Sequence, residues 1–260
     1  MKSDMRLPIL TYHGLEEASG RNGLYTLRRS QFEAQMTYLS EQNFRTISLE
    51  TMVKWILGEL IPPKSIVITF DDGLSSDFSI ALPILKRYGF TATFFVNPGR
   101  VGKEGYVTVE ELQKMKGAGM GIGSHGLDHV FLTRLEGEAL RDQVAGSKKR
   151  LEELLHEPIS FFSVPRGRYN RNVLSSVQNA GYRLACTSDI GVNSRSTDPF
   201  RLRRWAMKRS YTLEDFVSVI EGRPRRPLVL EYVVKRSAYR ILGHTLYEAL
   251  RGGLLKEERA

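Results

Sequence analysis

Residues 65–73 read Ser-Ile-Val-Ile-Thr-Phe-Asp-Asp-Gly, an apolar run that ends in two adjacent carboxylates. The β-branched and aromatic residues from 66 to 70 favour a buried strand, and Gly73 permits a sharp exit from it. Asp71 and Asp72 then lie at the C-terminal rim of the strand. Because neighbouring strand residues point to opposite sides, we expect the two carboxylates to have different neighbours and different roles.

A second segment supplies metal ligands. Residues 120–129, Met-Gly-Ile-Gly-Ser-His-Gly-Leu-Asp-His, run from a short strand into a turn and place His125 and His129 four positions apart. One carboxylate and two imidazoles with an open position form the ligand set of a catalytic zinc site. The same set occurs in iron oxygenases, but their usual jelly-roll fold disagrees with the strand and helix alternation here. Without a metal, one histidine would cap a turn and the other would hydrogen-bond in the core.

The segments Thr69–Gly73 and Ser124–His129 resemble the first two motifs of the polysaccharide deacetylases, the NodB-homology or family-four carbohydrate esterases. The resemblance extends from about Leu7 to about Val234. Strand and helix patterns alternate throughout, which favours a parallel sheet closed or nearly closed into a barrel. The family narrows this α/β fold to a distorted (β/α)7 barrel.

The resemblance also assigns roles to these residues. It implies that Asp72, His125 and His129 hold a divalent metal, Zn²⁺ with Co²⁺ or Ni²⁺ as alternatives. It makes Asp71 the base that takes a proton from water. Hydrolysis of an N-acetyl amide also needs groups that stabilise the oxyanion and protonate the departing amine.

The third family motif is usually Arg-x-Pro-Tyr/Phe-Gly, whereas residues 163–167 read Ser-Val-Pro-Arg-Gly. Pro165 matches, but Ser163 replaces the arginine that orients the base in the family. Arg166 and Arg168 are the candidate substitutes. The family also implies that the backbone N–H of Arg166 binds the oxyanion. Otherwise these two arginines are solvent-facing loop charges.

The fifth family motif normally provides a histidine after the last strand, but residues 227–234, which we expect to form that strand, contain none. His13 instead ends the first predicted strand. This resembles the branch of the family that acts on poly-N-acetylglucosamine, whose acid histidine is N-terminal. We therefore expect His13 to be the general acid, with a packing histidine as the alternative.

Three further residues are weaker candidates for substrate contact. Asp189 follows a predicted strand, and its alternative role is to form a turn before Gly191. Trp205 is a candidate for stacking on a sugar ring, or for packing in the interior. Asn97 lies at a strand end near the expected groove.

The chain has 260 residues, 41% hydrophobic and 26% charged, which suits one globular domain. We expect a single deacetylase domain over 1–260, with a basic helical extension from about 236 to 260. An irregular strand is expected over 200–208. A lone cysteine, Cys186, rules out an internal disulfide and fits a reducing compartment.

The net charge is +9, and residues 195–260 contain 15 Lys and Arg against 8 Asp and Glu. Such a basic region favours an anionic glycan, a phosphorylated sugar precursor or a membrane surface, unless it is only a solvated face. No zinc-finger, helix-turn-helix or RNA-binding pattern accompanies the charge, so nucleic acid is not expected. Residues 1–10 lack the apolar run of a signal peptide, and no apolar run is long enough to span a membrane, so we expect a cytoplasmic protein. Peripheral membrane contact through the basic C-terminal region is an open option.

The predicted function is metal-dependent removal of acetyl from an N-acetylated amino sugar, N-acetylglucosamine in a polysaccharide or in its lipid- or nucleotide-linked precursor. One alternative is a hydrolase of non-sugar linear or cyclic amides on the same scaffold. Another is a catalytically silent carbohydrate-binding relative, which the missing motif-three arginine and motif-five histidine would suit.

Overall fold

The computed structural model describes residues 6–17 and 23–238. The chain divides into two compact units, one up to Tyr211 and one from Thr212 onward. The organisation as one domain stays a prediction. No helix in the described ranges is long and apolar enough to cross a lipid bilayer.

The first unit is built on a parallel sheet whose strand order is β10-β1-β5-β6-β7-β8-β9, with β4 pairing β5 outside this path. Every pairing is parallel, so the C-terminal ends of the strands meet at one rim. The strands are β1 (Ile9–Tyr12), β4 (Arg45–Thr46), β5 (Ser65–Phe70), β6 (Thr93–Val96), β7 (Gly121–Ser124), β8 (Phe161–Ser163), β9 (Leu184–Cys186) and β10 (Trp205–Ala206). A separate small sheet pairs β2 (Leu15–Glu16) with β3 (Leu27–Arg28).

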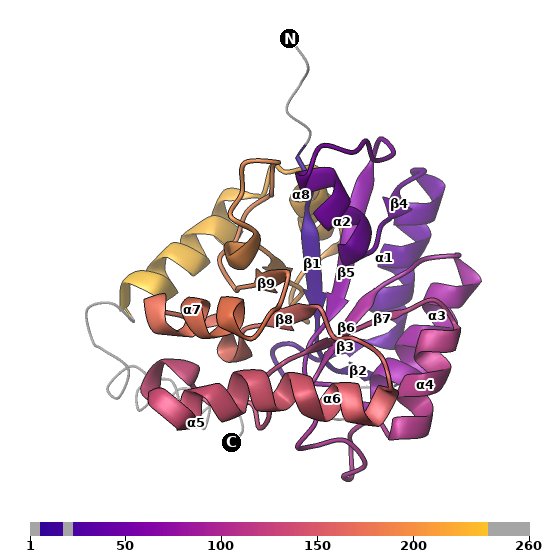
Figure 1. The fold of residues 1–260 in the computed structure, drawn as a ribbon. Helices are drawn as coiled ribbons and strands as arrows, with labels where there is room; N and C mark the ends of the chain where they lie inside the picture. The colour runs from indigo at the N-terminus through magenta and orange to yellow at the C-terminus, as the bar shows by residue number, and fades with distance from the viewer. Residues whose placement is uncertain (1–5, 18–22, 239–260) are drawn as a thin grey trace, which may run out of the picture. The chain divides into compact units, whose positions relative to one another are not determined.

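Helices of the first unit cover the sheet, most of them on its outer face (Figure 1), whereas the helix at 49–56 packs with Ile9 and Val67 of the inner face. They are α1 (Arg29–Glu41), α2 (Leu49–Ile56), α3 (Leu82–Arg87), α4 (Val109–Gly117), α5 (Gly137–Arg141), α6 (Ser147–Leu155) and α7 (Arg171–Asn179). The π-helical turn η1 (Asp77–Ala81) leads into α3, and η3 (Asp142–Gly146) joins α5 to α6. Short 3-10 turns are η2 (Leu132–Arg134), η4 (Pro165–Gly167) and η5 (Pro199–Arg201).

Alternation along the central strands separates an outer aromatic face from an inner face that is apolar at Ile9 and Val67 and becomes polar toward the C-terminal rim. Tyr12, Phe70 and Phe94 share a register, and their rings stack at centroid distances of 5.2 and 4.7 Å. The preceding residues face the other way, where the hydroxyls of Thr11 and Thr69 lie 3.0 Å apart. Asp71, two positions after Thr69, continues this second face, so the strand delivers its carboxylate to a buried polar interior.

The predicted last strand at 227–234 is wrong, because residues 226–238 are helical. Periodicity cannot separate a helix from a strand in such a short run of Leu and Val. Pro227 is tolerated in a first helical turn, and Glu231 and Lys235 form an ion pair of 2.6 Å one turn apart. The strand expected over 200–208 is reduced to β10, which takes the place beside β1.

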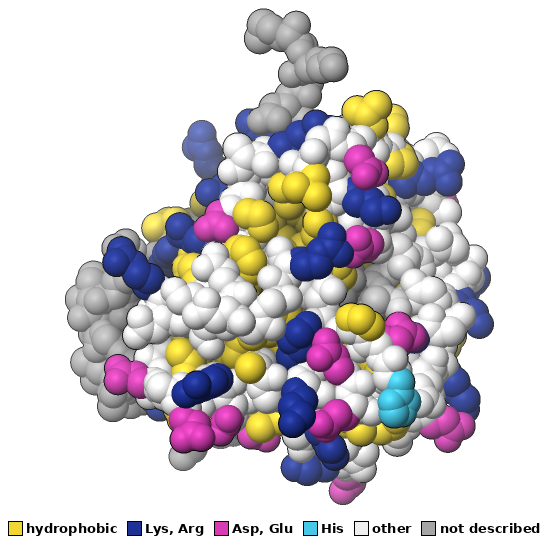
Figure 2. Space-filling view, in the orientation of Figure 1, with side chains coloured by type: hydrophobic (Ala, Val, Ile, Leu, Met, Phe, Trp, Pro, Cys, Tyr) yellow, Lys and Arg dark blue, Asp and Glu magenta, His cyan; other side chains and the backbone are white. Residues whose placement is uncertain are grey.

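The second unit contains α8 (Leu213–Ile220). Thr212 is its N-cap, and the Thr212 side chain accepts from the backbone N–H of Asp215. The basic extension predicted for 236–260 lies, from 239 onward, outside the described residues, so its membrane contact stays a prediction. Across the face shown in Figure 2, Lys and Arg side chains are interspersed with Asp and Glu.

Candidate metal centre and catalytic residues

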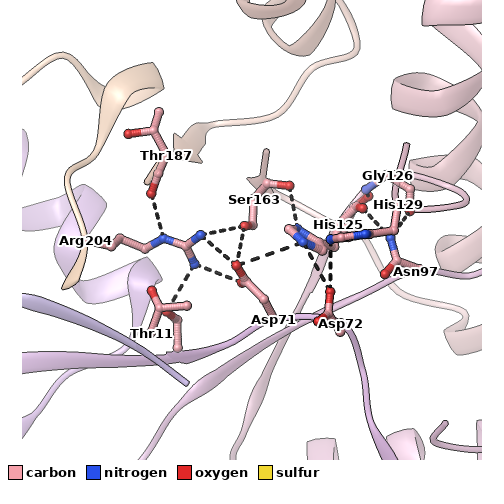
Figure 3. A network of polar contacts seen from close by, with 12 residues as sticks. Thr11, Asp71, Asp72, Asn97, His125, Gly126, His129, Ser163, Thr187 and Arg204 are labelled. Carbon is pink, nitrogen blue, oxygen red and sulfur yellow. Dashed lines mark hydrogen bonds and ion pairs between the residues drawn. The ribbon is translucent and has the colours of Figure 1, made fainter. Parts of the chain in front are cut away.

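The strand order brings three side chains from two distant segments to one point on the rim. Asp72 follows β5, and His125 and His129 follow β7, two strands away. The Oδ1 atom of Asp72 lies 3.6 Å from Nε2 of His125 and 3.2 Å from Nε2 of His129 (Figure 3). One ligand atom from each residue falls within 4.8 Å of the others, so these residues form a candidate metal site.

The local backbone is adapted to this convergence. Asp72 and His129 adopt positive φ angles of 83° and 57°, which L-residues rarely do. Strained conformations of this kind persist where surrounding structure enforces them, and they cluster at functional sites. The strain therefore agrees with a function for both side chains.

The donor set fits a divalent cation. Oδ1 of Asp72 is buried without a hydrogen-bond partner in the described part of the chain, an expensive arrangement unless an ion satisfies it. Nδ1 of His125 lies 2.8 Å from the carbonyl oxygen of Ser163. Donation from Nδ1 to this oxygen leaves the Nε2 lone pair of His125 directed at Asp72, as in metal-bound histidines.

Both imidazoles are kept neutral, the form in which they bind metals. Burial lowers the pKa of His125. Burial, followed by the nearby His125, lowers the pKa of His129 to about 4. At neutral pH each ring therefore offers a lone pair without having to lose a proton.

Asn97 supports the histidine loop. Its Nδ2 group donates to the carbonyl oxygens of His125 and, at 3.0 Å, of Gly126 (Figure 3). The Asn97 side chain is fully buried, so its role as a substrate contact gains no support from this placement. The structure instead gives it the task of orienting the loop that carries both histidines.

Asp71 is held by a buried guanidinium, that of Arg204. Nη1 and Nη2 of Arg204 donate to the two carboxylate oxygens at 2.9 and 2.7 Å, and the Ser163 hydroxyl donates to Oδ2 at 3.2 Å. Further donors of Arg204 reach the carbonyl of Thr187 at 3.0 Å and the hydroxyl of Thr69 at 3.2 Å. Burial would raise the pKa of Asp71, but the charge of Arg204 and its hydrogen bonds outweigh this effect and hold the pKa well below its usual range.

Arg204 is the functional residue that sequence reasoning missed. It binds Asp71 bidentately, a contact proposed from the sequence for Arg166 or Arg168. It comes from the segment just before β10, and Ser163, which stands in the family's arginine position, accepts from Nη2 of Arg204 at 2.9 Å. The only signal of Arg204 in the sequence was a charged residue inside the run Leu202-Arg-Arg-Trp205. Once β10 pairs with β1, the Arg204 side chain is turned toward the interior.

His13 lies at the same rim as the aspartates. It follows β1, whose Tyr12 is paired with Phe70 of β5, and its charge contributes to the lowered pKa of Asp71. Its ring lies 5.1 Å from that of Tyr25, and its Nδ1 is buried without a hydrogen-bond partner among the described residues. This position is compatible with an acid at the active site.

The remaining candidates surround the centre in different ways. Pro165 is buried beside Gly126, and Arg166 is exposed with a φ of 58°, which turns the backbone sharply after β8. Asp189 accepts a hydrogen bond of 2.6 Å from the Tyr169 hydroxyl. Trp205 is only 2% exposed, which suits its packing role and leaves its ring closed to a sugar.

The chain is similar in sequence to known proteins. A family model described as polysaccharide deacetylase matches residues 61–185. A Bacillus subtilis protein named as a polysaccharide deacetylase, YxkH, is 31% identical over 218 residues, which cover 84% of this chain and 77% of that protein. A poly-beta-1,6-N-acetyl-D-glucosamine N-deacetylase of Staphylococcus aureus is 24% identical over 201 residues, 67% of this chain and 69% of its own length.

The fold also has solved counterparts. The deacetylase PplD of Streptococcus pyogenes, determined in complex with acetate, superposes with a TM-score of 0.79 at 24% identity, over 84% of this chain and 99% of its own. This likeness confirms the distorted barrel of the NodB type expected from the sequence. With the identity to the Bacillus subtilis relative over most of both chains, it follows that this chain belongs to the polysaccharide deacetylase family.

Proposed function

We propose that this chain is a metal-dependent hydrolase of the N-acetyl group of an amino sugar, N-acetylglucosamine in a polysaccharide or in a lipid- or nucleotide-linked precursor. The observation that carries the proposal concerns both carboxylates. Oδ1 of Asp72, which has no hydrogen-bond partner among the described residues, lies beside two neutral imidazoles, and Asp71 is fixed nearby by Arg204. The name of the Staphylococcus aureus relative supports the sugar substrate.

Asp72, His125 and His129 would hold the cation. A divalent ion bound there polarises the acetyl carbonyl and lowers the pKa of water toward 7. This contribution is needed because Asp71, with its depressed pKa, is by itself a weak base.

Asp71 is ionised at neutral pH and accepts a proton from the attacking water. Arg204 and Ser163 hold its two oxygens in a fixed orientation, so no reorganisation is needed when the proton arrives. The hydroxide adds to the acetyl carbon and forms a tetrahedral oxyanion. The backbone N–H of Arg166 would donate to that oxygen.

His13 would complete the reaction as the acid. In its protonated form it donates a proton to the sugar nitrogen as the carbon–nitrogen bond breaks, which releases acetate and a free amine. His13 follows β1, which pairs with β5 on the side away from β7, the strand that precedes the two histidines, and its charge contributes to the lowered pKa of Asp71.

The test is acetate and amine release from N-acetylated β-1,4 and β-1,6 glucosamine oligosaccharides by the purified protein with Zn²⁺ or Co²⁺. The Asp71→Asn variant is the matched control, since it keeps the side chain's shape and the three ligands. Acetate release by the native protein, abolished in Asp71→Asn with metal content unchanged, is the expected result. Hydrolysis of non-sugar amides in place of all the saccharides would contradict the sugar assignment, and glycan binding without turnover would favour the silent relative.

A further inference from the structure

Two arginines flank the His129 side of the candidate metal centre. Arg100 belongs to the loop after β6, and Arg166 to η4 after β8. Nη2 of Arg100 lies 3.5 Å from the carbonyl oxygen of Asp128, which precedes His129, and Cζ of Arg166 lies 4.4 Å from the ring of Phe131, which follows His129 by two residues. Two separate elements therefore place positive charge beside the loop that carries His129.

Aromatic rings, rather than carboxylates, hold these two guanidinium groups. The Cζ atom of Arg166 lies 4.4 Å from the centroid of the Phe131 ring. Arg100 lies 5.2 Å from the centroid of the Tyr106 ring and donates from Nη1 to its hydroxyl at 2.5 Å. Within the described residues, neither arginine is paired with an acidic side chain. A cation–π contact uses the face of the guanidinium and leaves N–H donors at its edge for a ligand.

The carboxylate of Asp128, whose backbone Arg100 contacts, has another partner. Asp128 accepts from the Gln143 side chain at 3.1 Å, and Arg100 reaches only the backbone carbonyl of Asp128, at 3.5 Å. Asp71 is neutralised by Arg204, and Asp72 belongs to the candidate metal site. The charges of Arg100 and Arg166 therefore remain uncompensated by the acids of the site.

A neutral acetamide does not require this arrangement. A divalent cation already supplies the charge that its carbonyl oxygen needs, and two further positive groups beside it repel that cation. The cost is offset if the substrate itself brings a negative group. Arginine is suited to that task, because its planar fork matches the oxygens of a carboxylate or phosphate.

We propose that Arg100 and Arg166 bind an anionic group, a carboxylate or a phosphate, on a sugar adjoining the one that is deacetylated. The substrate class is therefore a negatively charged glycan. This inference deepens the proposed function, because the position of the anion is defined relative to the deacetylation site.

The test measures binding with sugars that lack acetamide, so that no turnover is involved. The probes are β-1,4-linked tetraglucuronate, cellotetraose and cellotetraose phosphorylated at C6, titrated calorimetrically into the full-length protein loaded with Zn²⁺. Arg100→Gln and Arg166→Gln are the test variants. Arg134→Gln is the matched control, since Arg134 ends η2, farther along the chain from His129, and lies over the same Phe131 ring at the longer distance of 5.1 Å.

We expect a charged tetrasaccharide to bind at least about fivefold more tightly than cellotetraose in 50 mM NaCl, with most of this preference lost in 500 mM NaCl. Comparing tetraglucuronate with the phosphorylated probe distinguishes a carboxylate from a phosphate. Each test variant should lower the preference by about threefold or more, while Arg134→Gln retains it.

Equal affinity for charged and neutral probes, or a preference that survives in both test variants, would overturn the inference. Acetate release from neutral N-acetylated oligosaccharides is measured separately. Failure of that assay would count against the proposed function, and failure of the titration would count against the anionic substrate alone.

Discussion

Replacement of Arg204 by methionine removes the guanidinium that holds Asp71 while keeping a long, unbranched side chain in the space. Arg204 is 2% exposed and donates to Asp71, Ser163, Thr69 and the carbonyl of Thr187. Asp71 is 3% exposed and would keep only the Ser163 hydroxyl as a described partner. Loss of one member of a buried ion pair costs about 3–5 kcal/mol. The melting temperature should therefore fall by roughly 6–20 °C.

The measurement is urea unfolding of metal-free protein, followed by tryptophan fluorescence, for four proteins. They are the native chain, Arg204→Met, the double variant Asp71→Asn/Arg204→Met, and Arg203→Met, which removes the neighbouring exposed arginine as a control. Because the double variant leaves no unpaired buried charge, it should be more stable than Arg204→Met by at least ~2 kcal/mol. Arg203→Met should lie within about 0.5 kcal/mol of the native protein.

The pH dependence gives a second check with a defined sign. In the native protein the pKa of Asp71 is lowered, so its contribution to stability is present above the unfolded pKa of about 4 and is lost as the pH falls through the folded pKa. In Arg204→Met, burial acts without Arg204 and raises the pKa. The stability deficit of the variant should therefore grow from pH 5 to pH 8. A loss below about 1 kcal/mol, or a double variant no more stable than Arg204→Met, would refute the buried pair.

Three other residues give predictions of their own. His13→Gln should lower kcat about 10²- to 10⁴-fold with zinc content unchanged, as measured by acetate release and metal analysis; a kcat within threefold of native would exclude His13 as the acid. In metal-free protein, the pKa of His129 is lowered to about 4, so its contribution to stability is present above the unfolded pKa of about 6.5 and is lost as the pH falls toward 4. The melting temperature of His129→Gln should therefore decline less over that pH range than that of the native protein. An identical decline would contradict the lowered pKa of His129. Asp77 is fully buried, and its carboxylate oxygens lack hydrogen-bond partners among the described residues. Burial raises the pKa of Asp77 well above the usual value, so the stability of the protein should fall as the pH rises above about 4. Asp77→Asn should raise the melting temperature at pH 8 more than at pH 5, and an equal effect at both would show that Asp77 is not held neutral.

The grouping of the three candidate metal ligands was predictable because its signals are local. In residues 65–73 and 120–129, a strand pattern is followed directly by the ligands, so strand ends and ligand positions are read from the same few letters. Parallel strands end at a common rim, and that brings the two segments together without knowledge of the loops between them. The structure places Asp72, His125 and His129 within reach of one ion, as this reasoning expects.

The partner of Asp71 was not predictable by the same means. Arg204 is 133 residues from Asp71 in the sequence, and its contact depends on β10 pairing with β1. The last strand was instead predicted at residues 227–234, whose Leu and Val content suits either a strand or a helix. With the last strand misplaced, nothing in the local sequence marked Arg204 as the partner of Asp71. Asn97 was likewise correctly placed at a strand end, but the direction of its side chain depends on the loop it supports.

The most direct test of the central claim is the zinc content of the purified protein and of its Asp72→Ala and His129→Ala variants, measured by mass spectrometry after dialysis against excess zinc and then buffer. Asp128→Ala, which alters an exposed carboxylate between the two histidines, is the control. One zinc per chain is expected in the native and control proteins, with little or none in either ligand variant. Full zinc content in both ligand variants, or none in the native protein, would contradict a metal centre formed by Asp72, His125 and His129.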